Sequence, residues 1–364
     1  MNANTESHRH AVTLKAQLDR QFFRKGLIVA ILSGMSYGLY SAFLTLGMAS
    51  GIWVEWMDPA TTVLSVFVVT YLLSAMGSAI NDTMSALWCL LTAAIKGKLG
   101  DFFRTLKSKP GAVMICAALV GGPISSSCYV IALQQAGSIV IPISALCPAF
   151  GAVLARLFFK QPLTPRMGLG IAICFFASFM IASTSLGGDA APGMALGLVL
   201  GLAAAFGWGL EGCIAGYGTS MIDYQIGITI RQLTSGLSNM IILLPIFGMI
   251  AGENAGFTWQ LLGQAFSDGG SIWFFVISGF FAMFAYSLWY KGNSMCGAAL
   301  GMACNGAFSF WGPFFCWIVL GLGCGQDGWA IAPIGWAAAV VMVIGIFIIA
   351  VNPLDFIKKG RTKR

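Results

Sequence analysis

Charged residues are scarce in this chain. Only 9% of its 364 residues are Asp, Glu, Lys or Arg, whereas 58% are hydrophobic. A soluble globular domain carries about 25% charged residues, so this scarcity excludes that class. The 27 Phe and 11 Trp exclude intrinsic disorder, because so much apolar surface cannot remain in water. The composition therefore predicts an integral membrane protein.

Residues for nucleophilic catalysis and metal binding are also scarce. Both histidines, His8 and His10, precede the first long apolar run, so we expect no Ser-His or Cys-His nucleophile within the membrane. The ten cysteines include no Cys-x-x-Cys pair, and we interpret them as small apolar residues. No Gly-x-x-x-x-Gly-Lys loop is present, so ATP is not expected to drive the protein directly. We expect neither an enzyme, nor a bound metal, nor a cofactor.

What the chain does contain is a series of long uncharged runs. A spanning helix needs about 20 mostly apolar residues, because it must cross roughly 30 Å of hydrocarbon. We expect residues 110–155 to form two spans separated by a polar hinge at residues 134–138. We expect residues 59–95 to cross once, as a broken or re-entrant element. The prediction is an all-α membrane protein with ten transmembrane helices, drawn from uncharged runs at residues 26–54, 59–81, 83–95, 110–155, 167–188, 190–210, 232–252, 269–290, 292–326 and 328–354.

The positions of the basic residues indicate how these spans are oriented. Lys and Arg in short loops are retained on the cytoplasmic side of a membrane. With both termini in the cytoplasm, 19 of the 20 basic residues fall on that side, and the outer loops receive acidic residues but no basic one. The exception is Arg231. The retention of basic residues on the cytoplasmic side thus explains the net charge of +7, and no nucleic acid is expected as a partner. The expected location is a bacterial plasma or inner membrane, which the chain crosses several times.

Ten spans divide into two halves of five, which must insert with opposite orientations if they share a fold. The first span contains Tyr37-Gly38-Leu39, and the sixth contains Trp208-Gly209-Leu210 at an offset of 171. Residues 80–87 align with residues 230–237 at an offset of only 150, so the first half carries about 21 extra residues, near 59–79. Inverted repeats are typical of secondary carriers that bind substrate between their halves. The expected organisation is a basic cytoplasmic segment (1–25), two five-helix repeats (26–188 and 189–354) and a basic cytoplasmic tail (355–364).

Three motifs carry a resemblance to a known family. They are the glycine-rich cores of the first and sixth spans, Gly121-Gly122-Pro123-Ile124 followed by Tyr129, and the segment 148–166 with its basic turn. On these residues the chain resembles the ten-helix, EamA-type carriers of the drug/metabolite transporter superfamily over residues 26–352. Gln161 stands where that family usually has an acidic residue, and residues 59–79 are an insertion. The resemblance implies two inverted five-helix bundles, alternating access and movement of small metabolites or drugs.

Three ionisable residues are expected at membrane depth: Asp82, Glu211 and Arg231. A charge there costs several kcal/mol unless it is paired or faces water, so each is a candidate for substrate binding or coupling. Glu211 could exchange a proton for substrate or hold a substrate ammonium, and Arg231 could meet a substrate carboxylate. Equally, Glu211 and Arg231 could form a structural ion pair. For Asp82 a broken-helix cap is favoured over a substrate contact, and we expect it at a depth opposite to that of Glu211.

Aromatic and amide side chains complete the candidate site. Aromatic faces attract a substrate ammonium through cation–π interactions, although core packing or an interfacial belt explains many such residues. Asn305 could hydrogen-bond a polar ligand or a neighbouring helix. The aromatic candidates are Tyr37, Tyr40, Tyr129, Trp208, Tyr286, Trp289 and Trp311.

Together these features favour a secondary active transporter of a small polar organic metabolite, in particular an amino acid or an amine. Its transport could be coupled to protons. The alternative is a non-transporting membrane protein such as a channel or a sensor. The expected partners are the small-molecule substrate, protons and membrane lipids, and the chain could form a homodimer.

Overall fold

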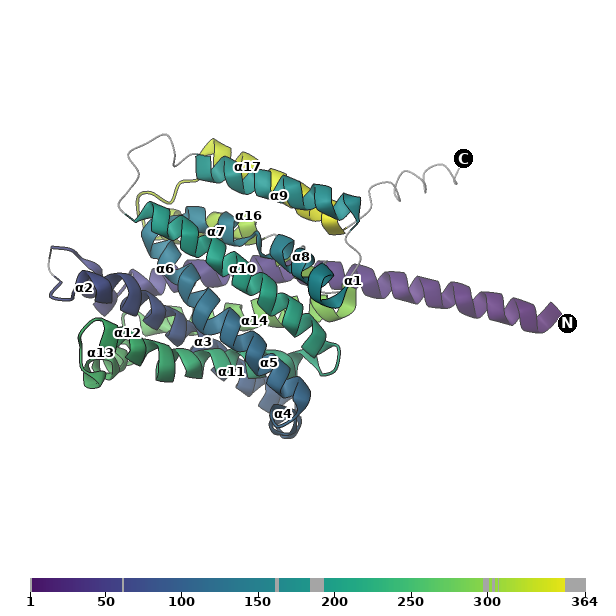
Figure 1. The fold of residues 1–364 in the computed structure, drawn as a ribbon, viewed down its shortest axis with the longest axis horizontal. Coiled ribbons are helices and arrows are strands. Elements are labelled where there is room, and N and C mark those ends of the chain that lie inside the picture. The colour runs from purple at the N-terminus through teal and green to yellow at the C-terminus, as the bar shows by residue number, and fades with distance from the viewer. Residues whose placement is uncertain are drawn as a thin grey trace.

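The computed structural model describes residues 2–60, 62–160, 164–183, 193–296, 301–302, 305–306 and 308–350. These residues form helices and irregular connections, with no strand among them, and the helices pack into one bundle (Figure 1). Segments η1, η2, η4 and η5 are π-helical, and η3 is a short 3-10 turn. In chain order the elements are α1 (Asn2–Met48), α2 (Ile52–Met57), η1 (Val68–Leu73), α3 (Ser74–Ile95), α4 (Leu99–Leu106), α5 (Lys109–Leu119), η2 (Val120–Ser126), α6 (Ser127–Ala136), η3 (Gly137–Ile139), α7 (Val140–Ser144), α8 (Cys147–Phe159), α9 (Pro165–Ser183), α10 (Met194–Thr219), α11 (Tyr224–Ser238), η4 (Asn239–Leu243), α12 (Leu244–Ile250), α13 (Ala255–Ser267), α14 (Ile272–Cys296), α16 (Phe308–Cys316), η5 (Trp317–Gly323) and α17 (Pro333–Ala350).

Several of these helices are long and apolar enough to cross a membrane. Because they also carry few charged residues, they indicate a membrane-embedded protein. Helix is present in the described part of every segment for which the sequence predicts a span. Among the described residues, five stretches are both long enough and apolar enough to span a membrane: Ile28–Met48, Lys109–Ala136, Met194–Thr219, Tyr224–Ile250 and Ile272–Met295.

The hinge predicted within residues 110–155 is confirmed. Helix α6 ends at Ala136, and Gly137 follows with a backbone φ of 65°, a conformation that glycine adopts without steric cost. The chain then passes through η3 into α7, so two helical segments are separated where polar residues interrupt the run. Residues 59–95 differ from the re-entrant alternative. After an irregular connection, η1 continues directly into α3, which makes one helical stretch of Val68–Leu73 and Ser74–Ile95.

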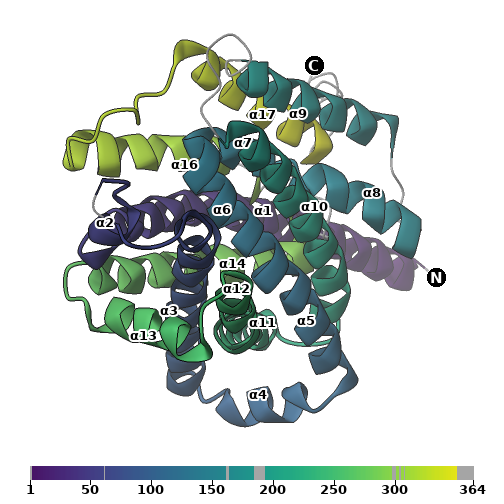
Figure 2. The ribbon, with the colours of Figure 1, turned by 60° about the vertical axis from the view of Figure 1, so that its left-hand side comes forward.

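Many of the helix contacts join the two halves of the chain. Helix α1 packs against α14 and α16, and α10 packs against α6 and α8. Likewise α3 contacts α14 while α11 contacts α5. Two further pairs that join the halves are α3 with α11 and α9 with α17, and the latter pair lies along the outside of the bundle (Figures 1 and 2).

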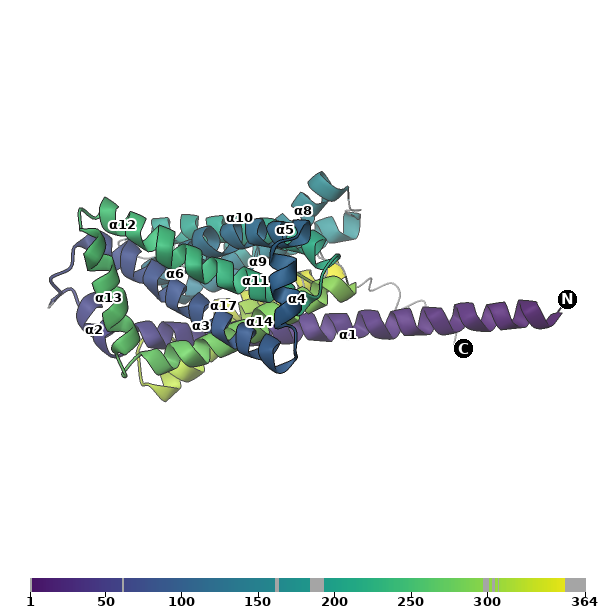
Figure 3. The same cartoon turned by 90° about the horizontal axis from the view of Figure 1, so that it is seen from below.

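The charged connections lie at opposite ends of the bundle. The connection from α3 to α5, which holds α4 and four basic residues, lies toward the end from which the N-terminal part of α1 projects (Figure 3). Helices α2 and α13 lie at the other end, where Glu55 and Asp268 are found. The basic segment 1–25 is helical from Asn2 and continuous with the first predicted span. The predicted tail 355–364 lies outside the described residues.

Candidate functional site

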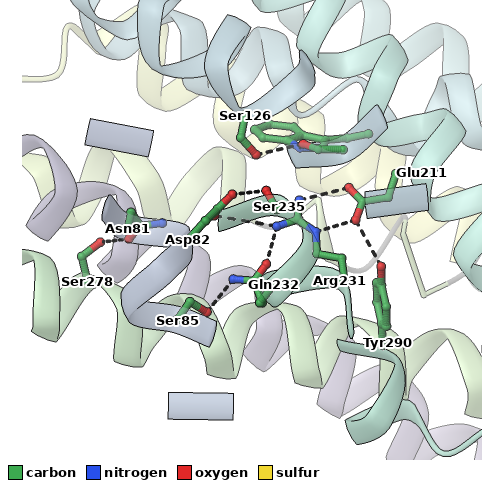
Figure 4. Close-up of polar contacts among 12 residues, drawn as sticks. Asn81, Asp82, Ser85, Ser126, Glu211, Arg231, Gln232, Ser235, Ser278 and Tyr290 are labelled. Carbon is green, nitrogen blue, oxygen red and sulfur yellow. Dashed lines mark hydrogen bonds and ion pairs between the residues drawn. The ribbon is translucent and has the colours of Figure 1, made fainter. Parts of the chain in front are cut away.

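The three ionisable residues expected at membrane depth meet in the centre of the bundle (Figure 4). Arg231 of α11 donates from Nε to Oε1 of Glu211 on α10 at 2.7 Å, and from a terminal nitrogen to Oε2 at 3.3 Å. The other terminal nitrogen lies 3.8 Å from Oδ1 of Asp82 on α3. All three side chains are buried. The predicted ion pair of Glu211 with Arg231 is thus present, and we call the three residues the ionic cluster.

The structure corrects two expectations for Asp82. It lies in the middle of α3, whose caps are Leu73 and Lys96, so it does not cap a broken helix. Nor does it lie at a depth opposite to that of Glu211, because both carboxylates contact the same guanidinium group. Ser235, one turn beyond Arg231 on α11, donates its hydroxyl hydrogen bond to Asp82.

Polar side chains around the ionic cluster were not singled out by sequence reasoning. Tyr290 donates to Oε1 of Glu211 at 3.1 Å, and Arg231 also donates to Oε1 of Gln232. Gln232 in turn donates to the hydroxyl of Ser85, one turn beyond Asp82 on α3 (Figure 4). The sequence does contain a signal for two of them. Ser85 follows Asp82 by three residues and Ser235 follows Arg231 by four, and residues at these spacings lie on the same face of a helix.

Two adjacent glycines make room for the ionic cluster. A Cβ added at Gly121 would collide with the carboxylate of Glu211, and one added at Gly122 would collide with the Ser235 side chain. Both glycines belong to η2, where Pro123 lacks the N–H needed for regular helical bonding. The Gly121 carbonyl accepts hydrogen bonds from Ser126 at 2.9 Å and from the indole of Trp208 at 3.1 Å. The Gly-Gly-Pro sequence thus leaves space for the Glu211 carboxylate and provides the carbonyl that the Trp208 indole binds.

A small aromatic cavity adjoins the ionic cluster. The space open to a water molecule is about 10 Å³, room for roughly one water. Tyr286 joins the two features, because it lines the cavity while the guanidinium carbon of Arg231 lies 4.1 Å from its ring centre. The buried indole N–H of Trp289, on the cavity wall, has no hydrogen-bond partner among the described residues. The cavity is lined by Tyr37, Cys147, Trp208, Ala285, Tyr286, Trp289, Asn305 and Phe308.

Most of the aromatic candidates lie at this cavity or directly behind its lining. Tyr40 and Tyr129 do not line it, but their rings contact Tyr37 at centroid distances of 4.7 and 6.1 Å. Trp311 is not a lining residue either, and it stacks on Phe315. The candidates predicted from the sequence that do line the cavity are Tyr37, Trp208, Tyr286, Trp289 and Asn305.

The cavity lies between the two halves of the chain. Tyr37 of α1 and Cys147 of α8 belong to residues 26–188, while the remaining lining residues belong to residues 189–354. The ionic cluster has the same arrangement, since Asp82 comes from the first half and Glu211 and Arg231 from the second. In the described part of the chain, no group of three or more His, Cys, Asp or Glu side chains could hold a metal ion.

Polar contacts also join the halves at both ends of the bundle. At the basic end, Lys98 pairs with Asp223 at 2.9 Å, and Asp223 caps α11 by accepting from the backbone N–H of Gln225. Partial burial raises the pKa of Asp223, but the hydrogen bond and charge of Lys98 and the capping N–H groups outweigh it and hold the pKa below its usual value. At the acidic end, Asp268 accepts from the backbone N–H of Ile52 at 3.1 Å.

Comparison with known proteins shows a likeness of fold. No protein-family model matches the chain, and no curated protein matches its sequence. Among solved structures, 26 chains match. One is a crystal structure that is 16% identical in sequence, with a TM-score of 0.51, and the match covers 88% of this chain and 95% of that chain. At this identity the match shows a similar arrangement of helices and nothing about activity.

Proposed function

We propose that this protein is a secondary active transporter that moves a small organic solute with an ammonium group, an amine or an amino acid, across the cytoplasmic membrane by alternating access. The observation that carries the proposal is a small aromatic cavity beside a buried ionic cluster, both built from the two halves of the chain. Buried ionisable residues in a membrane protein mark substrate or ion pathways by default, because holding them there is costly.

The packing of the two halves against each other supports the same proposal. We propose ten spans in two inverted five-helix repeats, with both termini in the cytoplasm, as in the EamA-type carriers that the sequence resembles. The paired contacts α1 with α14 and α10 with α6 are what such a repeat would produce. A site between two similar halves can be opened to either side by rocking one half against the other.

The chemistry of the cavity favours a cationic group on the solute. Five of its lining side chains, Tyr37, Trp208, Tyr286, Trp289 and Phe308, are aromatic and present faces that attract cations. The neighbouring ionic cluster holds two carboxyl groups against one guanidinium, so it does not repel a positive charge. Asn305 and the indole N–H of Trp289 supply polar contacts for the rest of the solute. An amino acid would use these donors for its carboxylate.

A binding screen followed by a flux measurement tests this proposal. Purified protein is screened by thermal shift against amino acids, amines, carboxylates and sugars, and each hit is tested for counterflow in proteoliposomes. We expect hits among the amines and amino acids, saturable uptake, and counterflow driven by the same solute on the other side. Trp289→Phe should weaken solute binding without lowering thermal stability to the same degree as Trp208→Phe. Ion conductance without counterflow would instead indicate a channel, and binding without any flux would indicate a sensor.

A further inference from the structure

The two carboxyl groups of the ionic cluster are held very differently. Glu211 accepts three hydrogen bonds, from Nε of Arg231 at 2.7 Å, from a terminal nitrogen of Arg231 at 3.3 Å, and from the hydroxyl of Tyr290 at 3.1 Å. Hydrogen bonds from a guanidinium stabilise the ionised form of a carboxyl group strongly. Glu211 and Arg231 thus form an ion pair with no net charge, in which each charge is compensated by the other.

Asp82 receives much less support for a negative charge. Its nearest guanidinium nitrogen is 3.8 Å away, beyond hydrogen-bond distance, and that nitrogen already donates to Gln232. Its hydrogen-bond partners are the hydroxyl of Ser235 and the side chain of the neighbouring Asn81, both uncharged. A hydroxyl can donate to a carboxylate and can also accept from a carboxylic acid, so Ser235 accommodates Asp82 in both protonation states.

The groups that interact electrostatically or by hydrogen bonds with Asp82 from other helices come from four of them. Arg231 and Ser235 lie on α11, Glu211 on α10, Tyr40 on α1, and Tyr286 on α14. With Asp82, Glu211 and Arg231 all ionised, the cluster would carry one uncompensated negative charge in the centre of the bundle. Such a charge costs several kcal/mol in a dry environment, and one proton on Asp82 removes it.

From this asymmetry we propose that Asp82 is the residue that holds the exchangeable proton of the transport cycle, while Glu211 remains ionised and paired with Arg231. The proposal rests on the proposed transport function. It replaces the simpler expectation that Glu211 exchanges the proton.

The proton and the solute compete through charge. When the cavity opens to water, the O–H bond of the Asp82 carboxyl breaks, the proton passes to water, and the carboxylate keeps the electron pair. A solute ammonium seated near Tyr286 compensates the negative charge that remains, since Tyr286 both lines the cavity and interacts electrostatically with Asp82. When the solute leaves, Asp82 takes up a proton again. This predicts exchange of one proton for one cationic solute.

Infrared spectroscopy tests the proton on Asp82 without knowledge of the solute. The protein in lipid bilayers should show the C=O band of a protonated carboxylic acid near neutral pH, and ¹³C labelling of aspartate carboxyl groups should shift it while labelling of glutamate should not. Asp82→Asn should abolish the band. Asp268→Asn, at a carboxyl group on the outside of the bundle, is the matched control and should keep it. A band that shifts with glutamate labelling, or that survives in Asp82→Asn, overturns the proposal.

A flux measurement then tests whether this proton is exchanged. Proteoliposomes loaded with a pH-sensitive dye are exposed to tetramethylammonium, a permanent cation, or to a mixture of the common amino acids. Wild-type protein should change the internal pH on addition of a transported solute. Asp82→Asn should abolish the pH change and weaken exchange of the labelled cation, because the carboxylate that the ammonium neutralises is gone. A wild type that exchanges solute with no pH change overturns the role of Asp82. A wild type that exchanges none of these solutes while the Asp82 band is present counts against the transport function instead.

Discussion

Nε of Arg231 lies 2.7 Å from Oε1 of Glu211, and both side chains are fully buried. Two charges in such a place are costly to bring out of water, and their attraction repays the cost only when the hydrogen bonds are nearly complete. Here the guanidinium also reaches Gln232 and Asp82, and Glu211 also accepts from Tyr290. The pair is therefore one part of a network that includes α3, α10, α11 and α14.

Removing Arg231 should destabilise the protein strongly. Arg231→Ala leaves two carboxyl groups without their guanidinium partner, and breaking a buried pair on one side costs about 3–5 kcal/mol. The double variant Arg231→Ala with Glu211→Gln should recover part of this loss, because the amide carries no charge to leave unpaired. Unfolding in mixed detergent micelles measures the free energies. Strictly additive losses would show that the two residues do not act as a pair.

Gly121→Ala should displace the Glu211 carboxylate, because the added methyl group occupies the space that the carboxylate fills. Overpacking of a tight site costs about 1–3 kcal/mol, and here it also disturbs the contact with Arg231. The matched control is Gly263→Ala in α13, where an added Cβ meets nothing within 4 Å. That variant should be neutral or more stable, since alanine favours helix. Equal thermal stability of the two variants would argue against the close fit at Gly121.

Much of the helical framework could be predicted from the lengths of the uncharged runs. The cost of placing a charge in hydrocarbon limits where the apolar part of a spanning helix can lie, so run lengths locate α14 and the start of α10. They do not locate the start of α1, which is helical from Asn2. Asp82 shows where this reasoning fails. A charge at this position predicts the end of an uncharged run, but Asp82 lies in mid-helix within hydrogen-bond reach of Ser235, and the helix continues through it.

The contacts of the site were harder to predict than its residues. Tyr37, Trp208 and Glu211 were found because they stand in glycine-rich cores or carry a charge where charges are rare. Tyr290 and Gln232 were missed because their roles depend on how α14 and α11 are rotated about their axes. A single sequence sets the spacing along each helix but not which faces meet in the bundle.

Asp223 should stabilise the protein in two separable ways. Asp223→Ala removes both the cap of α11 and the pairing with Lys98, and loss of an N-cap costs about 0.5–2 kcal/mol. Asp223→Asn keeps a capping oxygen and loses only a partly exposed ion pair, which is worth about 0–1 kcal/mol. Asp101→Asn, in an exposed pair with Arg104, is the control and should change stability little. Thermal unfolding compares the three, and equal losses in the two Asp223 variants would exclude a capping role.

The contribution of Asp223 should also depend on pH. Its pKa is lowered in the folded state, so its stabilisation is fully present above the usual aspartate pKa, near 3.9, and is lost as the pH falls through the lower folded value. The stability difference between wild type and Asp223→Asn should therefore be constant near neutral pH and shrink only in strongly acidic solution. A difference that already disappears between pH 7 and pH 5 would contradict the lowered pKa.

Trp208 and Trp289 allow the same chemical change to be made on two walls of one cavity. Both indoles are buried, but within the described part of the chain only that of Trp208 donates a hydrogen bond, at 3.1 Å to the Gly121 carbonyl. Replacing either residue by Phe removes similar bulk, so the difference between the variants isolates the hydrogen bond. A typical hydrogen bond contributes about 0.5–1.5 kcal/mol, and Trp208→Phe should be the less stable variant by that amount. The free energies of unfolding of the two variants, measured under the same conditions, test this prediction. A larger loss of stability in Trp289→Phe would mean that the indole N–H of Trp289 has a hydrogen-bond partner in the folded protein.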